Sequence, residues 1–162
     1  WLLIGMLGGI GNSMILGNFD TTFAAHPEMA LYIPLIGGTG GNVGTQSSAL
    51  VVQGLANSSL DSGNTFQQIL KESVVALINA TIISMLVYIY NFIRFGATAT
   101  VSYSVSISLF AVVMFASIFG TLVPMTLEKL KIDPAIATGP FISITNDIIG
   151  MMMYMGITVL LS

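Results

Sequence analysis

Asp147 is an acidic residue near the middle of a long apolar run, from Pro134 to Leu161. A helix rises about 1.5 Å per residue, so a run of this length crosses a bilayer with some tilt and places Asp147 near the midplane. An acid there costs roughly 2.5 to 3.5 kcal/mol, and such acids usually face a polar cavity or an ion path. No basic residue is predicted at comparable depth; the four in the chain are Lys71, Arg94, Lys129 and Lys131. We therefore expect a proton or a cation from outside the chain to balance the charge of Asp147.

Oxygen-bearing residues accompany Asp147 on one side of the predicted helix. Ser143 and Gly150 share its face, and Asn146 lies beside it. Pro140 lacks an N–H, which would leave a backbone carbonyl oxygen without its helical donor. A carboxylate combined with amide, hydroxyl and bare carbonyl oxygens suits a hard cation such as Mg²⁺ or Ca²⁺. The alternative is a protonated Asp147 that hydrogen-bonds an asparagine.

The segment from Pro34 to Gly54 is unusually rich in glycine. Each glycine costs a helix up to about 1 kcal/mol, so a plain lipid anchor would not be expected to contain so many. One helical face carries small residues that predict close helix packing: Gly37, Gly40, Gly41, Gly44 and Ser48. The opposite face is a polar stripe of Thr39, Asn42, Gln46 and Gln53. The stripe indicates a polar pathway; alternatively, the glycines only pack helices and the amides only bond across them.

Other candidate residues give weaker signals. Ser47 and Ser48 have no base within reach in the sequence, and no second acid or base is predicted at the depth of Asp147, so an enzyme is not expected. The glycine string at 37–44 lacks the Lys-Ser/Thr ending and the preceding strand of a phosphate loop. The methionines are typical of lipid-facing or core positions. Four asparagines are interpreted as residues that join helices: Asn12, Asn18, Asn79 and Asn91.

Composition indicates an integral membrane protein, most simply of the cell (inner) membrane. Hydrophobic residues make up 54% of the 162 residues and charged residues 7%, whereas soluble domains carry about 25% charged residues. The net charge of −3 indicates no particular partner, and no basic cluster suggests nucleic acid. The sequence has no cysteine, so thiolate metal sites and disulfides within it are excluded. It begins at Trp1 inside an apolar run, which is typical of a piece of a longer protein.

The apolar segments predict an all-α membrane protein, a single domain over residues 1–162 with five transmembrane helices. The predicted spans are approximately 1–19, 29–56, 74–95, 104–127 and 134–161. Polar connections separate them, including a Ser/Asn/Gly-rich loop at 57–64, a turn at 96–102 and a charged hairpin at 128–133. Pro134 is expected to be the first helical residue after that hairpin.

Basic residues predict the orientation in the membrane. Lys71, Lys129 and Lys131 fall on one side of the predicted spans and Arg94 on the other. The positive-inside rule therefore makes the connections 57–73 and 128–133 cytoplasmic. With five spans, the N-terminus is then cytoplasmic and the C-terminus external.

Two motifs resemble the second and fifth spans of the MgtE family of magnesium channels and related eukaryotic magnesium carriers. They are GGNVGTQ at 40–46 and DPAIATGPFISITNDIIG at 133–150. The resemblance covers the whole chain as a five-span domain. It implies a homodimer in which these two spans of each subunit line a pore on the two-fold axis. It also implies that Asp147 is the ion-binding acid, with Asn42 and Gly150 at matching motif positions.

The resemblance carries further expectations about the site and about regulation. We expect a channel that conducts hydrated Mg²⁺, with metal-binding residues Asp147, Asn42, Ser143 and Gly150 and further pore-lining residues Thr39, Gln46, Asn146 and Gly38. Two subunits would supply two carboxylates, which neutralise a divalent cation. Family members usually carry a cytoplasmic N-terminal domain and a paired CBS module that sense Mg²⁺, and such regulatory domains are absent from these 162 residues.

Two alternatives to a Mg²⁺ channel are kept. A carrier that couples Mg²⁺ to Na⁺ or H⁺ would also suit a lone acid at the midplane. A membrane assembly subunit without transport activity would use the glycine face and the asparagines only to hold partners. Carriers commonly contain internal repeats, and the sequence shows no convincing one, which favours the channel. Selectivity among Mg²⁺, Mn²⁺, Co²⁺ and Ca²⁺ is left open.

Overall fold

The computed structural model describes residues 1–60, 64–96, 99–137 and 139–161. Parts of the predicted connections at 57–64 and 96–102, and residue 138 of the predicted fifth span, lie outside the described residues. All regular secondary structure within the described ranges is helical, which confirms the all-α prediction.

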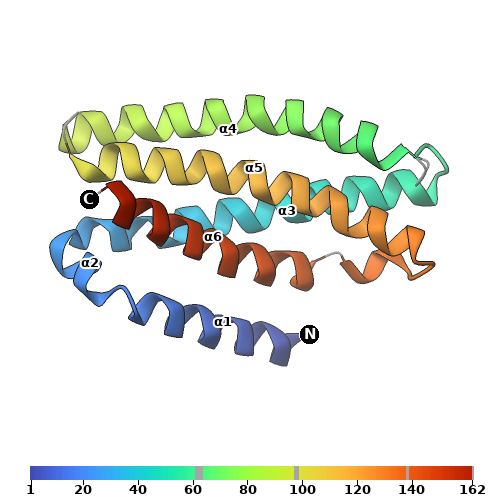
Figure 1. Cartoon of the computed structure of the whole chain (residues 1–162), viewed down its shortest axis with the longest axis horizontal. Helices are drawn as coiled ribbons and strands as arrows, with labels where there is room; N and C mark the ends of the chain where they lie inside the picture. Colours follow the sequence, from blue (N-terminus) through green and yellow to red (C-terminus); the bar gives the residue numbers. More distant parts are fainter. Residues whose placement is uncertain (61–63, 97–98, 138, 162) are drawn as a thin grey trace.

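The long helices follow the predicted apolar segments (Figure 1). They are α1 (Leu2–Gly17), α3 (Ile33–Ala56), α4 (Thr65–Phe95), α5 (Thr100–Lys129) and α6 (Pro140–Leu161). The short elements are α2 (Asp20–Ala25) and two 3₁₀ helices, η1 (Pro27–Tyr32) and η3 (Pro134–Ala137).

Three helices in the described part of the chain, α4, α5 and α6, are long and apolar enough to cross a membrane. Helix α1 is apolar but has 16 residues, and α3 contains the glycines and polar residues that lower its hydropathy. The structure therefore supports three spans, and the count of five stays a prediction.

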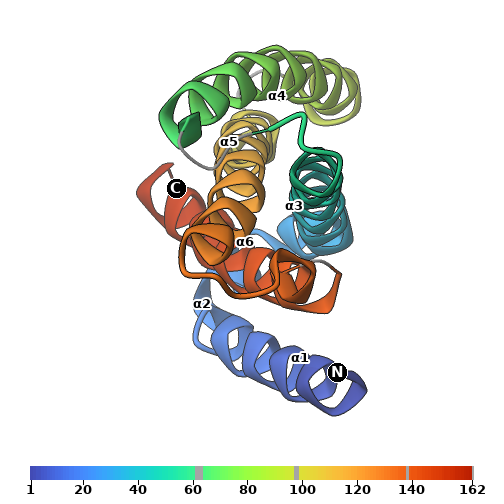
Figure 2. The same cartoon turned by 90° about the vertical axis from the view of Figure 1, so that its right-hand side faces the viewer.

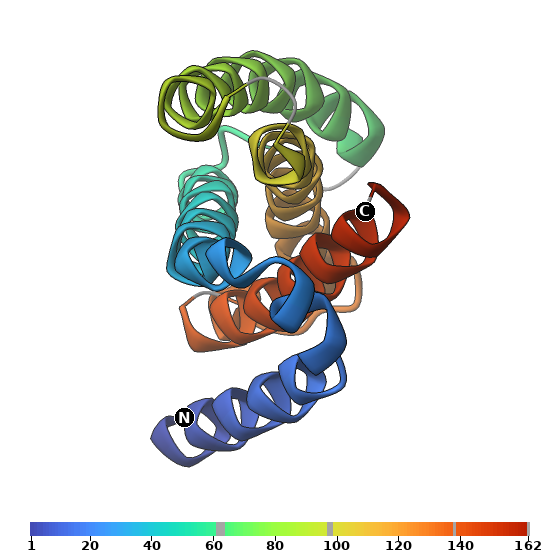
Figure 3. The same cartoon turned by 90° about the vertical axis from the view of Figure 1, so that its left-hand side faces the viewer.

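The helices pack in a fixed order across the bundle. Helix α4 covers one side of α5, α3 and α6 both pack on α5, and α1 packs on α6 at the far side (Figures 2 and 3). The two termini lie toward opposite ends of the bundle, and the C-terminal end of α3 and the start of α4 lie at the same end as the N-terminus (Figure 1). This arrangement agrees with an odd number of passes along the bundle.

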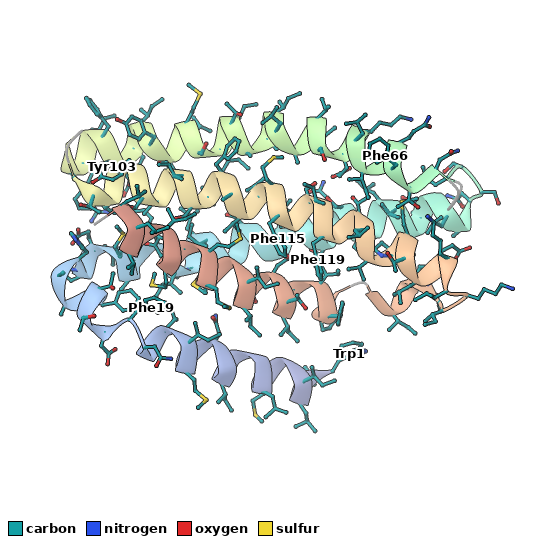
Figure 4. All side chains as sticks on the ribbon, viewed as in Figure 1. Trp1, Phe19, Phe66, Tyr103, Phe115 and Phe119 are labelled. Carbon is teal, nitrogen blue, oxygen red and sulfur yellow. The ribbon has the colours of Figure 1, made fainter. Side chains whose placement is uncertain are left out.

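Helix α5 forms the centre of the bundle. Its buried apolar residues include Val101, Val105, Leu109 and Val112, and they pack with Tyr154 of α6. By contrast, side chains project outward from α4 along one side and from α1 along the other (Figure 4). Large exposed apolar residues on these outer faces are expected where lipid replaces water as the solvent.

Helix α4 begins at Thr65, nine residues before the predicted start at 74. The prediction started the span after the charged pair Lys71-Glu72, because it followed apolarity alone. Lysine, glutamate, glutamine and leucine all have good helix propensity, so the helix continues through this polar stretch.

The predicted fifth span is interrupted. Its first residues form η3, Gly139 has a φ of +63°, and α6 begins at Pro140. Proline cannot donate to the carbonyl four residues earlier and its ring clashes with it, and glycine tolerates the left-handed conformation before it. The predicted continuous helix from Pro134 is therefore wrong, and Asp147 lies seven residues after the start of α6 rather than at the middle of one helix.

Glu72 links its own helix, α4, to α3 and α5. Its Oε1 accepts hydrogen bonds from Ser47 Oγ of α3 at 2.8 Å and from Ser117 Oγ of α5 at 2.6 Å. The two serine hydroxyls are 3.1 Å apart, and both residues are buried. The carboxylate of α4 thus fixes α3 against α5.

Close backbone approach fixes α3 against α5 and α6. A Cβ atom added to Gly44 would overlap the Asn146 side chain and stand 2.9 Å from Ile142 Cγ2, and one added to Gly120 would overlap the carbonyl group of Gly44. A side chain larger than that of glycine would not fit either contact without a shift of the helices.

Glu72→Ala should lower the free energy of unfolding by about 1 to 3 kcal/mol, because it removes a charged acceptor shared by two buried hydroxyls. Glu72→Gln should retain most of the stability, since its amide oxygen still accepts. The matched control is Glu128→Ala, because Glu128 is exposed on α5. Thermal unfolding in detergent measures all three variants, and equal melting temperatures for the two alanine variants would refute the role of Glu72.

Gly44→Ala should destabilise the fold by about 1 to 3 kcal/mol through overpacking. Gly156→Ala is the matched control, since no atom lies within 4 Å of a Cβ added there. That variant should be neutral or slightly stabilising, because alanine has the higher helix propensity. The comparison is made by unfolding in detergent without divalent cations. Equal stability of the two variants would contradict the packing role of Gly44.

Candidate metal site

A cavity of about 250 Å³ lies in front of Asp147, where α3, α6 and α1 meet. Helix α3 approaches α6 closely enough to form it because its facing residues are glycines. The cavity is lined by Asn12 of α1, by Ile33, Pro34, Gly37, Gly38, Gly41 and Asn42 of α3, and by Ser143, Asp147 and Met151 of α6.

Two bare glycines face the carboxylate of Asp147. A Cβ added to Gly41 would stand 3.3 Å from Asp147 Oδ1 and 3.1 Å from Ser143 Oγ, and one added to Gly37 would stand 3.6 Å from Asp147 Oδ1. Any larger residue at these positions would take the space next to the carboxylate. The predicted packing face of α3 therefore also forms part of the cavity wall, at Gly37 and Gly41.

The Asp147 carboxylate has no hydrogen bond or ion pair with any group in the described ranges. The basic side chains lie elsewhere; Arg94, for example, donates to Tyr90 Oη at 2.8 Å near the end of α4. No asparagine within these ranges bonds the carboxylate either, as a protonated Asp147 held by an asparagine would require. The described residues also contain no cluster of three or more His, Cys, Asp or Glu side chains, so Asp147 is the one acid among the neutral residues that line this cavity.

Some of the predicted site residues meet at this cavity. Asn42, Ser143 and Gly38 line it together with Asp147. Gln46 lines a separate hollow at the surface of α3 with Leu50 and Gln53. Thr39 is half-buried and is not among the lining residues. Of the polar stripe, Asn42 is thus the residue that lines this cavity.

Gly150 and Asn146 lie on the side of α6 that faces the bundle centre. A Cβ added to Gly150 would contact Val112 Cγ1 of α5 at 3.4 Å, so this glycine allows α6 to pack on α5. Asn146 is buried against Gly44, and neither polar atom of its amide has a partner within the described ranges. In this structure these two residues belong to the packing between helices.

Asn12 is a cavity residue that the sequence reasoning did not select. It was grouped with Asn91, whose Oδ1 accepts from Tyr32 Oη and whose Nδ2 donates to Val101 O at 3.5 Å, as a helix-joining residue should. Asn12 differs, because its buried Oδ1 has no partner among the described residues. The sequence feature that could have identified Asn12 is its position after the small residues Gly5, Gly8 and Gly9, because these residues let α1 lie close to α6.

The chain is similar to known transport proteins over almost its whole length. The profile of the family MgtE, divalent cation transporter, matches residues 33–157. The magnesium transporter MgtE of Bacillus subtilis is 32% identical over 97% of the chain, and that of Thermus thermophilus is 32% identical over 99%. The protein of the same name from Enterococcus faecalis is 28% identical over 97%.

The chain spans about a third of the length of these relatives, 34 to 35% of each. The matched residues include α3 and α6, whose facing sides form the cavity, and the resemblance noted from the two sequence motifs is confirmed. The chain therefore belongs to the MgtE family of divalent cation transporters.

Proposed function

We propose that this chain forms the membrane pathway of a Mg²⁺ transporter and acts as a channel for the hydrated ion, with Asp147 as its binding acid. The observation that carries the proposal is the Asp147 carboxylate, which has no partner among the described residues and lies in a cavity that also presents Asn42 and Ser143. Relatives that are named magnesium transporters support the choice of ion.

The size of the cavity suits a hydrated ion. Mg²⁺ prefers six ligands and gives up its waters reluctantly, and six waters at about 30 Å³ each take about 180 Å³. The cavity of about 250 Å³ accommodates such a complex. The Asp147 carboxylate would then attract the ion and accept hydrogen bonds from its waters, while Asn42 and Ser143 would bind other waters of the shell.

A second copy of the chain completes the site in this proposal. One carboxylate balances half the charge of Mg²⁺, and Pro34, Gly38 and Asn42 are exposed, so the cavity opens at the surface of the single chain. An exposed amide is costly against lipid, whereas a two-fold partner would cover it and bring a second Asp147 to the axis. Helices α1 and α3 then cross the membrane with α4, α5 and α6, and the end with Lys71, Lys129 and Lys131 is cytoplasmic.

Asp147→Asn should abolish most Mg²⁺ binding and flux in liposomes, because it keeps the size of the side chain and removes its charge. Asp147→Glu should retain part of both. Without Mg²⁺ the Asn variant should be no less stable than the parent. With Mg²⁺ at 100 times the dissociation constant, the parent should gain about 2.7 kcal/mol of stability and the Asn variant much less.

The control for this experiment is Asp20→Asn, since Asp20 is an exposed acid in the first turn of α2, away from the cavity. It should leave Mg²⁺ flux and the Mg²⁺-dependent melting temperature unchanged. Near-normal transport by Asp147→Asn, with equal stabilisation of variant and parent by Mg²⁺, would show that a proton balances the acid and would sink the assignment. Mg²⁺ flux driven by voltage alone, without a Na⁺ or H⁺ gradient, separates the channel from a coupled carrier.

Single cysteines should test the two-fold arrangement, because the chain has no cysteine of its own. Asn42→Cys should be cross-linked into dimers by a short bifunctional maleimide in membranes, since the proposal places Asn42 of both subunits beside one axis. Ile93→Cys, which is 78% exposed on the outer face of α4, should stay monomeric on gels. Equal cross-linking at the two positions, or cross-linking at Ile93 alone, argues against a dimer axis at the cavity.

A further inference from the structure

We infer that Asn12 of α1 is a specificity-determining residue of the Asp147 site and binds a water of the hydrated cation. The inference rests on the proposed function, because it assigns a further residue to the same site. It extends the site beyond α3 and α6 to a third helix, α1.

Asn12 and Asp147 both line the same two cavities. Both line the cavity of about 250 Å³ on the α3 side. Both also line a smaller cavity of about 80 Å³ between α1 and α6, together with Gly5, Gly8 and Gly9 of α1. The amide of Asn12 and the carboxylate of Asp147 therefore border the same spaces from two helices.

The Asn12 side chain is unsatisfied in the described structure. Its Oδ1 has less than 1 Å² of accessible surface and no hydrogen-bond partner within the described ranges. A buried acceptor without a donor costs about 1 to 3 kcal/mol, so such groups are uncommon unless a water or an ion satisfies them. By contrast, Asn18 at the C-terminal end of α1 is satisfied locally, because its Nδ2 donates to Met14 O at 2.9 Å.

The chemistry of the pair suits a hydrated divalent cation. A carboxylate attracts the cation, and a neutral amide oxygen accepts a hydrogen bond from a bound water without adding charge. Because Mg²⁺ retains its waters and Ca²⁺ exchanges them for direct ligands, a water-binding amide favours Mg²⁺. Asn12 would thus raise the preference for Mg²⁺, while Asp147 supplies most of the attraction for either ion.

The test is calorimetric titration of the purified protein in detergent with MgCl₂ and with CaCl₂. The binding assigned to the site is the part that is present in the parent and lost in Asp147→Asn. Asn12→Leu should raise the dissociation constant for Mg²⁺ by about two- to tenfold, the size of one lost hydrogen bond. The dissociation constant for Ca²⁺ should change less, so the ratio of Mg²⁺ affinity to Ca²⁺ affinity should fall. Asn12→Ser keeps an oxygen and should restore part of the Mg²⁺ preference, and Asn18→Leu is the matched control with no effect on either ion.

A second measurement separates ion binding from a purely structural role. Without divalent cations, Asn12→Leu should melt at the same temperature as the parent or higher, because the orphaned acceptor is gone. A lower melting temperature with unchanged ion binding would identify Asn12 as a helix-joining residue and overturn the inference. An unchanged ratio of Mg²⁺ to Ca²⁺ affinity would overturn it as well. If Asp147→Asn removes no binding at all, the proposed function itself fails, whatever Asn12 does.

Discussion

The structure depends on how closely α3 can approach α5 and α6. A Cβ added to Gly40 would stand 2.8 Å from Val112 Cγ1, and one added to Gly44 would overlap Asn146. Each glycine costs the helix up to about 1 kcal/mol of propensity, and the packing that it permits offsets this cost. The same bare backbone continues one turn earlier at Gly37 and Gly41, in front of Asp147. One run of glycines therefore both assembles the bundle and leaves the space in which an ion can be bound.

Two acids in this bundle have different roles because their surroundings differ. The Glu72 carboxylate accepts hydrogen bonds from Ser47 and Ser117 through Oε1, so it links α4 to α3 and α5. The Asp147 carboxylate has no partner among the described residues and borders an open cavity. An unpaired carboxylate in apolar surroundings is costly, and the cost falls when a cation arrives. The partners of each acid, rather than its depth in an apolar run, distinguish a structural acid from a candidate ion-binding acid.

Periodicity and apolarity predicted what one helix can establish by itself. The helical class, the glycine face of α3 and the grouping of Asp147 with Ser143 could all be read from residue spacing. The break at Gly139–Pro140 was missed because apolarity is continuous through it, although proline chemistry forbids the helix there. Glu72 and Asn12 were missed because spacing identifies the face of a helix but not the residues opposite it. Their roles come from Ser117 and Asp147, which are 45 and 135 positions away in the chain.

The cavity and the main anchoring contact lie on different parts of helix α6. Asp147 lies about 10 Å from its first residue and about 21 Å from its last, so the cavity belongs to its N-terminal third. In the C-terminal half, Tyr154 is fully buried and its hydroxyl donates to Met29 O at 2.8 Å. A rotation by one residue position would turn α6 by about 100° and carry Asp147 away from Gly41. The Tyr154–Met29 bond opposes that rotation. Tyr154, two turns after Asp147, thus helps to set the direction of the carboxylate although it does not line the cavity.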